Sequence, residues 1–258
     1  MRSMKSVKKA VNCCCEKGRI LIKHGRKQQA GSDISVIMIR KRKPDGLVSV
    51  FCLRKFPERR QVLKLDRKTA EKELERAGRM NPGKWVDHSR FVAQACERIA
   101  GLCSGMSADA AYCFGLLHDI GRYAGVSSEK HLIDGYRFCM ERGWEKAAQI
   151  CISHTFMIQG IRTAIGTVDV SEEEYRFMDD FIRNAVYDDY DRLVQLCDSL
   201  ALPDGFCILE KRFVDVALRY GTVPVMAKRW KKTLEIREMF EKKTGVSVYQ
   251  VLPEAVKL

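Results

Sequence analysis

The feature that most constrains this chain is a helical spacing of apolar residues that begins at Asp66 and persists through the rest of the sequence. Between Trp85 and Ala100 the apolar side chains recur at intervals near three and four, which is the period of an amphipathic helix. Further segments of this kind follow, separated by short turns. We therefore predict an all-α domain, a helical bundle, over residues 66–258.

Capping and turn residues delimit the expected helices. Ser107 suits the N-cap of a helix that ends at Leu117, and Ser171 with Glu174 forms a capping-box pattern. Turn sequences at 81–83 and 203–205 separate other helices. The predicted helices are 66–77, 85–100, 108–117, 130–141, 144–153, one that starts at 171, 187–202, 207–220 and 225–243.

Residues 1–65 differ from the remainder in charge. They hold 18 Lys and Arg against 4 Asp and Glu, a net charge of +14, whereas residues 66–258 hold 28 against 29, a net of −1. Two apolar runs at 34–39 and 47–53, joined by Pro44-Asp45-Gly46, indicate strands of a hairpin, which alone is only marginally stable. We expect a basic, weakly structured N-terminal extension over 1–65: an arm, a small docked hairpin, or an upstream segment without function.

Composition excludes several classes of protein. No apolar run approaches the roughly 20 residues that span a bilayer, and the first 18 residues lack the apolar core of a secretory signal. We expect a cytoplasmic protein that does not bind membranes. The 11 cysteines include no C-x-x-C pair, and most of those beyond residue 65 occupy apolar positions of helical runs, so we expect reduced, buried thiols.

The stretch AYCFGLLHDIGR, residues 111–122, places His118 and Asp119 side by side at the end of an apolar helix. Alone, the pair is compatible with a capped helix end, with Gly121 supplying the positive φ of a C-terminal turn. The other histidines favour a metal site. Apart from His24, every histidine lies in or beside a helix between residues 88 and 154, at His88, His118, His131 and His154. Facing helices of a bundle can project such side chains to one point.

A further carboxylate is expected from a later helix. Asp198 lies in an almost wholly apolar run, where an unpaired carboxylate would be costly, so a metal would explain it. The acidic cluster at 188–191 is interpreted as a solvent-exposed helix start. Imidazoles with carboxylates suit Fe, Mn, Zn, Co or Ni better than Mg alone, which prefers oxygen ligands.

In order and context, His88, the pair His118-Asp119 and Asp198 resemble the pattern of the HD-domain metal-dependent phosphohydrolases. The resemblance covers residues 66 to about 220, and LLHDIGR is similar to the HD-I-G variant. His131 and His154 stand where some members carry two more histidines, in segments similar to the bacterial diadenosine tetraphosphate hydrolase group. The resemblance implies one or two divalent ions: the first on His88, His118, Asp119 and Asp198, the second on Asp119, His131 and His154.

The resemblance also implies a function. We expect a hydrolase that uses metal-activated water on phosphoester or phosphoanhydride bonds of a nucleotide or another small phosphorylated metabolite. Asp119 and Arg122 are the expected catalytic residues. Arg122 and Lys130 are the expected phosphate ligands. Many relatives carry Lys at the position of Arg122. For Arg122 a surface charge is the alternative. The loop 120–130 is expected to be a mobile lid. The charged run 210–212 is expected to be a solvent-exposed helix face, with contact between the substrate and Glu210, Lys211 or Arg212 as the alternative.

Two other interpretations stay open. In the first, the domain is a non-catalytic regulatory HD module that binds a nucleotide, and its basic arm contacts nucleic acid. Nucleic acid is not an expected partner elsewhere on the chain. In the second, the domain would be a structural helical protein, if the four histidines lay apart in space. The sequence does not predict an oligomeric state.

Overall fold

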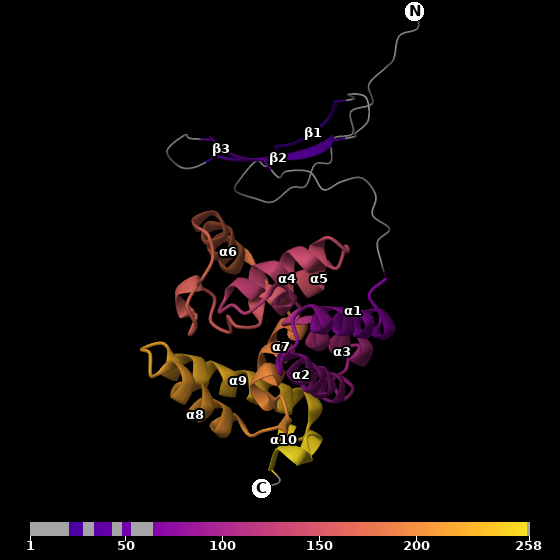
Figure 1. Ribbon diagram of the computed structural model, residues 1–258, viewed down its shortest axis with the longest axis vertical. Helices are drawn as coiled ribbons and strands as arrows, with labels where there is room; N and C mark the ends of the chain where they lie inside the picture. Colours follow the sequence, from indigo (N-terminus) through magenta and orange to yellow (C-terminus); the bar gives the residue numbers. More distant parts are fainter. Residues whose placement is uncertain (1–20, 28–33, 43–47, 53–63, 257–258) are drawn as a thin grey trace, which may run out of the picture. The chain divides into compact units, whose positions relative to one another are not determined.

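The computed structural model describes residues 21–27, 34–42, 48–52 and 64–256, in two units that divide between residues 61 and 62 (Figure 1). The first unit contains an antiparallel sheet of order β1-β2-β3, formed by β1 (Leu21–Lys27), β2 (Ile34–Arg42) and β3 (Val48–Cys52). Arg40 pairs with Leu21 on one side and with Val50 on the other.

The sheet has one strand more than the expected hairpin. Strands β2 and β3 correspond to the predicted runs at 34–39 and 47–53, and the predicted turn at 44–46 lies outside the described residues. Strand β1 was missed because LIKHGRK contains only two apolar residues, too few for a strand pattern.

The second unit is all-α apart from one two-residue pair of strands, as predicted, and none of its described helices is long and apolar enough to cross a membrane. The nine predicted helices are present, with bounds that differ by at most three residues from those expected. Its elements are α1 (Arg67–Met80), α2 (Trp85–Ala100), α3 (Ala108–Leu117), η1 (Ile120–Ala124), α4 (Lys130–Met140), α5 (Glu145–Ser153), η2 (Ile161–Thr163), α6 (Glu172–Asn184), α7 (Asp189–Leu200), β4 (Ala201–Leu202), β5 (Gly205–Phe206), α8 (Leu209–Tyr220), α9 (Met226–Thr244), α10 (Val248–Val251) and η3 (Pro253–Val256).

The helix starts follow the expected capping chemistry. Ser107 accepts a hydrogen bond from the backbone N–H of Ala110, and the Ser171 and Glu174 capping box is formed at the start of α6. Helix α7 begins with a second capping box, between Asp188 and Asp191. These caps satisfy backbone donors that the first turn of each helix leaves without a partner.

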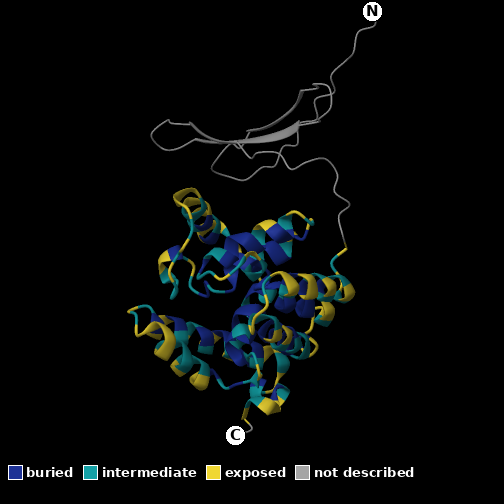
Figure 2. Cartoon of the chain, viewed as in Figure 1, coloured by how far each residue is buried: buried dark blue, intermediate teal, exposed yellow. Residues whose placement is uncertain are grey.

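Helix α7 is the centre of the second unit. It contacts α2, α3, α5, α8 and α9, and Figure 1 shows it between the α4–α6 group and the α8–α10 group. Its residues Leu193, Leu196 and Leu200 belong to the largest apolar core, and Figure 2 shows buried residues along the inner faces of the surrounding helices. Asp198, near the end of α7, is thereby placed within the bundle.

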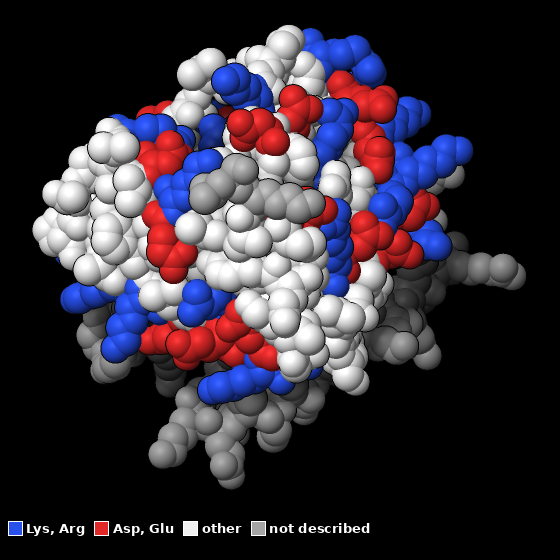
Figure 3. Space-filling view, turned by 90° about the horizontal axis from the view of Figure 1, so that it is seen from below, with Lys and Arg blue, Asp and Glu red and all other residues white. Residues whose placement is uncertain are grey.

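The cysteines and the surface charge agree with the composition. The described cysteines beyond residue 65 are all buried and free, as predicted: Cys96, Cys103, Cys113, Cys139, Cys151, Cys197 and Cys207. On the face shown in Figure 3, Lys and Arg side chains stand beside Asp and Glu without a wide area of one sign. This mixture fits the near-zero net charge of residues 66–258.

Gly121 is required for close packing and not for a positive φ, so the left-handed turn of the capped-helix alternative is not formed. A Cβ at this position would lie 1.9 Å from the carbonyl oxygen of His131 and 2.4 Å from the backbone nitrogen of Gly135. Both neighbours are backbone atoms of α4, which cannot rotate away. Glycine therefore permits η1 to approach α4, and this approach sets the distance between Asp119 and His131.

Gly121→Ala should destabilise the protein by about 3 kcal/mol or more, because the new methyl group overlaps backbone atoms of a packed helix. Urea unfolding followed by circular dichroism measures this loss. Gly105→Ala is a suitable control, since that position has a φ of 84° and open space for the Cβ. It should cost only about 1–2 kcal/mol. Equal losses for the two variants would contradict the packing argument.

Candidate metal centre

Six histidine and aspartate side chains meet in the interior of the helical unit. His88 comes from α2, His118 and His154 follow the last residues of α3 and α5, and Asp119 begins η1. His131 lies in the first turn of α4 and Asp198 in the last turns of α7. We name these six residues the histidine–aspartate cluster. Its members are the six residues predicted as metal ligands, and the fold brings them together.

The cluster has two halves that share His118. In the first, Nε2 of His88 lies 2.9 Å from Oδ1 of Asp198, and Nε2 of His118 lies 3.9 Å from the same oxygen. In the second, Oδ1 of Asp119 lies 3.1 Å from Nε2 of His131 and 3.6 Å from Nε2 of His154. Oδ2 of Asp119 lies 3.9 Å from Nε2 of His118. Potential ligand atoms of the triads His88–His118–Asp198 and His118–Asp119–His154 lie within 4.8 Å of one another.

Backbone carbonyls fix the orientation of three imidazoles. Nδ1 of His118 lies 2.7 Å from the carbonyl oxygen of Gly115, and Nδ1 of His131 lies 2.5 Å from that of Ser128. Nδ1 of His154 lies 3.0 Å from the carbonyl oxygen of Cys151. A carbonyl only accepts, so Nδ1 carries the hydrogen and a neutral ring presents the lone pair of Nε2. Each lone pair is directed at the cluster, as in metal-ligating histidines.

Electrostatics favours the ligand form of these groups. Burial lowers the pKa of His118, and burial together with the neighbouring His118 lowers the pKa of His154 to about 3. Burial alone would raise the pKa of Asp119, but the charges of Arg122 and the nearby imidazoles hold it well below its usual range. Near neutral pH both imidazoles are therefore neutral and the carboxylate is ionised, which is the state a cation binds.

The cluster leaves buried acceptors without donors among the described residues. Nε2 of His118 and Oδ1 of Asp119 are buried and have no hydrogen-bond partner, and both side chains are less than one-tenth exposed. Buried polar atoms are nearly always satisfied, and an exception requires an explanation. A shared cation would stabilise these acceptors, which are the inward lone pairs of two imidazoles and one carboxylate oxygen. The donor set therefore fits a divalent metal.

Gly115 allows the first half of the cluster to form. A Cβ on Gly115 would lie 2.9 Å from Cα of Ala93, which shows that α2 and α3 pack with their backbones close together. This contact brings His88 and His118 to a ring-centroid distance of 5.3 Å. The apolar residues of AYCFGLLHD thus anchor α3 against α2, and His118, directly after α3, lies 3.9 Å from Asp198 of α7.

The later aspartates differ from expectation. Asp191, expected at a solvent-exposed helix start, is fully buried. Its carboxylate is satisfied there by hydrogen bonds from Lys146, Gln149 and Ser153. Asp198, expected to be deeply buried, has a side chain that is 20% exposed. The polar residues at this helix start predicted exposure to solvent, but residues of α5, which is distant in sequence, cover Asp191. This network joins α7 to the end of α5 where His154 lies.

The two predicted phosphate ligands are placed differently. Nε of Arg122 donates to Oδ2 of Asp119 at 2.6 Å, and the Arg122 side chain is 31% exposed at the edge of the cluster. Nζ of Lys130 lies 2.6 Å from both carboxylate oxygens of Asp134, so its charge is already paired along α4. The structure brings Arg122, and not Lys130, to the cluster.

The predicted lid segment 120–130 is more regular than expected. Its first half forms η1, in which Ile120 and Gly121 are buried. Its end is attached to the loop after α5, because Asp169 accepts from the backbone N–H groups of Ser128 and Lys130 at 2.8 and 2.7 Å.

Three charged residues beside the cluster were not among the predicted site residues. Arg212 was assigned to a solvent-exposed face, yet its side chain is only 18% exposed and lies 3.6 Å from Asp198. Arg229 and Glu129 are buried. A signal for Arg229 was present: with Met226 and Thr233 it occupies the buried stripe of α9, where an arginine is unusual. For Glu129 the sequence holds no comparable signal.

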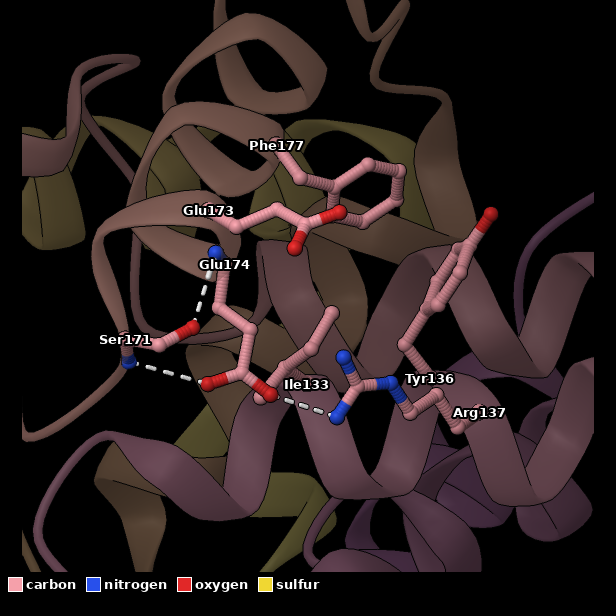
Figure 4. Close-up of a pocket in the computed structure, with 7 residues that line it drawn as sticks. All are labelled: Ile133, Tyr136, Arg137, Ser171, Glu173, Glu174 and Phe177. Atoms are coloured by element: carbon pink, nitrogen blue, oxygen red, sulfur yellow. Dashed lines mark hydrogen bonds and ion pairs between the residues drawn. The ribbon is translucent and has the colours of Figure 1, made fainter. Parts of the chain in front are cut away.

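The described structure also has a surface pocket of about 440 Å³ between α4 and α6 (Figure 4). The ion pair between Arg137 and Glu174 crosses it, and Tyr136 and Phe177 line it with a ring-centroid distance of 5.2 Å. No member of the histidine–aspartate cluster lines this pocket, so the pocket is separate from the candidate metal centre.

The fold and the cluster together define a class: a helical domain with a candidate histidine–aspartate metal site. Residues 85–202 match the family model of the HD domain, a span that begins at α2, ends at β4 and contains all six cluster residues. The match supports the HD-domain superfamily, whose members are generally metal-dependent phosphohydrolases. No curated protein and no solved structure matches the chain significantly.

His118 should be the most sensitive ligand for metal content, because it belongs to both triads. His118→Ala should therefore lower the content of bound divalent metal more than His88→Ala or His154→Ala, each of which disturbs only one triad. Elemental analysis of the purified variants, with circular dichroism to confirm folding, measures this order. Full metal retention by folded His118→Ala protein would show that the cluster is not a metal site.

Proposed function

We propose that the protein is a hydrolase of phosphoester or phosphoanhydride bonds that works with one or two divalent cations bound by the histidine–aspartate cluster. The observation that supports it most is the convergence of His118, Asp119 and His154, in which Nε2 of His118 and Oδ1 of Asp119 are buried and have no hydrogen-bond partner among the described residues. The HD-domain match over the same residues supports the phosphohydrolase class. Imidazole and carboxylate ligands favour Fe, Mn, Zn, Co or Ni over Mg alone.

The cluster residues divide into two ligand sets. His88, His118, Asp119 and Asp198 would hold one ion, and Asp119, His131 and His154 the other, with Asp119 common to both. When bound, such cations supply an acidified water and neutralise charge on phosphoryl oxygens. The position of Asp119 supports the shared role, since Oδ1 faces His131 and His154 while Oδ2 faces His118.

The chain itself provides orientation and charge. The carbonyls of Gly115, Ser128 and Cys151 hold the imidazoles at fixed angles, so the ligands are arranged before a substrate arrives. Arg122 uses Nε on Asp119, and its remaining N–H groups can donate to a phosphoryl oxygen in the bidentate manner of a guanidinium. We assign Arg122 as the residue that orients the phosphoryl group. Lys130 would contribute less to phosphate binding, because the carboxylate of Asp134 already neutralises its charge.

The substrate is proposed to be a nucleotide or another small phosphorylated metabolite. The likeness of the segments around His131 and His154 to diadenosine tetraphosphate hydrolases makes dinucleoside polyphosphates a reasonable first group to assay. A regulatory module that holds a nucleotide without cleaving it is the alternative, and turnover of nucleotides by the metal-loaded wild type separates the two.

The double variant His118→Ala/Asp119→Ala should lose bound metal and phosphohydrolase activity together, because it removes Asp119, which both sets share, and His118 of the first set. We expect a fall of at least about a thousandfold in turnover of a panel of nucleotides, dinucleoside polyphosphates and p-nitrophenyl phosphate. Incubation of the wild-type protein with a chelator should produce the same loss, reversed by added Mn²⁺.

Asp204→Asn is a matched control, since Asp204 is exposed in the turn between β4 and β5. It should keep the wild-type metal content and rate. Wild-type activity in a metal-free double variant would contradict the proposed function. Nucleotide binding without turnover by the metal-loaded wild type would support the regulatory alternative instead.

A further inference from the structure

Two arginines from helices beyond the HD-domain match lie beside the histidine–aspartate cluster. Nη2 of Arg212, in α8, lies 3.6 Å from Oδ1 of Asp198. Nη1 of Arg229, in α9, donates to the carbonyl oxygen of Thr155, the residue that follows His154. Arg122 donates to Asp119 on the other half of the cluster. Each carboxylate of the cluster therefore faces an arginine.

Arg212 is mostly buried and has no good acceptor among the described residues. Its nearest carboxylate oxygens belong to Asp198 and Asp215 and lie at 3.6 and 3.7 Å, beyond hydrogen-bonding distance. A guanidinium carries five N–H donors, and burial of a charge with unfilled donors is costly. The N–H groups of Arg212 can therefore donate to an anion bound beside the cluster.

Arg229 is held in a fixed orientation. Its Nη1 donates to the carbonyl oxygens of Thr155 and Thr163 at 2.7 and 2.9 Å, and the residue is only 9% exposed. Nε and Nη2 of Arg229 make no hydrogen bond to the described residues. A donor fixed in this way loses little conformational entropy when a ligand binds, which favours binding.

Glu129 balances the charge of the site when no ligand is present. It is 7% exposed, its Oε2 has no hydrogen-bond partner, and its charge acts on both Arg122 and Arg229. Three carboxylates, of Asp119, Asp198 and Glu129, thus offset three arginines. A cation on Asp119 and Asp198 would compete with Arg122 and Arg212 for the same carboxylate charge. An anionic ligand would then restore the balance.

We propose that Arg212 and Arg229 form a second phosphate subsite, which holds a phosphoryl group linked to the one at the histidine–aspartate cluster. This inference rests on the proposed function and narrows its substrate class. Substrates with two or more linked phosphates gain contacts with both arginines, whereas a monophosphate reaches only the cluster and Arg122. The helices after the HD-domain match therefore set the specificity of the site.

The test uses methylenediphosphonate, in which a carbon atom replaces the bridging oxygen of a diphosphate so that the probe is not hydrolysed. Binding to the full-length, Mn²⁺-loaded protein is measured by calorimetry, with orthophosphate as the single-group comparison. Arg212→Gln should weaken diphosphonate binding about tenfold or more, the loss expected for a charge-assisted hydrogen bond, and orthophosphate binding less than about threefold.

Lys228→Gln is the matched control, because Lys228 is exposed on α9 next to Arg229. It should leave both affinities unchanged. Arg212→Lys and Arg229→Lys retain the charge but lose the guanidinium fork, and each should show a smaller loss that is again selective for the diphosphonate. They serve as the test if Arg212→Gln does not fold.

Equal losses for the two probes would place Arg212 at the cluster phosphate and overturn the second subsite. Unchanged diphosphonate binding in folded variants would also overturn it. Metal uptake and p-nitrophenyl phosphate hydrolysis by the wild-type protein test the proposed function separately. A wild type that passes those tests, with variants that lose no selectivity, refutes the subsite alone.

Discussion

The hydrogen bonds from the imidazoles to backbone carbonyls are the interaction on which the rest of this structure depends. In His118, His131 and His154, Nδ1 contacts the carbonyl of the residue three positions earlier. For His118 and His154 that carbonyl belongs to the last turn of a helix, where carbonyls lack an intrahelical partner. One bond therefore satisfies a helix end, selects the tautomer and points Nε2 at Asp119.

The packing of the helices sets where those lone pairs meet. Gly115 lets α3 approach α2, and Gly121 lets η1 approach α4, in both cases because a Cβ would overlap backbone atoms. Helix α7 contacts α2, α3 and α5, and so brings Asp198 to the same place. Buried Asp191 joins α7 to α5 through Ser153, the residue before His154. The apolar core thus supplies the rigidity that a set of converging acceptors needs, since these groups would otherwise move apart.

Much of the second unit could be predicted because its information is local. Helical period and caps at Ser107 and Ser171 gave the helices, and four histidines in one all-α window indicated a common site. Contacts between distant segments could not be predicted. Asp191 was assigned to solvent because its partners lie in α5, and Arg212 because its neighbours on α8 are charged. Gly121 was assigned a conformational role because sequence does not show which helix passes beside it.

The central claim is that the six residues of the histidine–aspartate cluster hold divalent metal. The direct measurement is anomalous X-ray scattering at the manganese edge from crystals of the full-length protein grown with Mn²⁺. The account predicts a peak about 2.0–2.3 Å from Nε2 of His118, with carboxylate oxygen of Asp119 or Asp198 at a similar distance. Absence of a peak at the cluster under saturating Mn²⁺, with the imidazoles still directed inward, would contradict it.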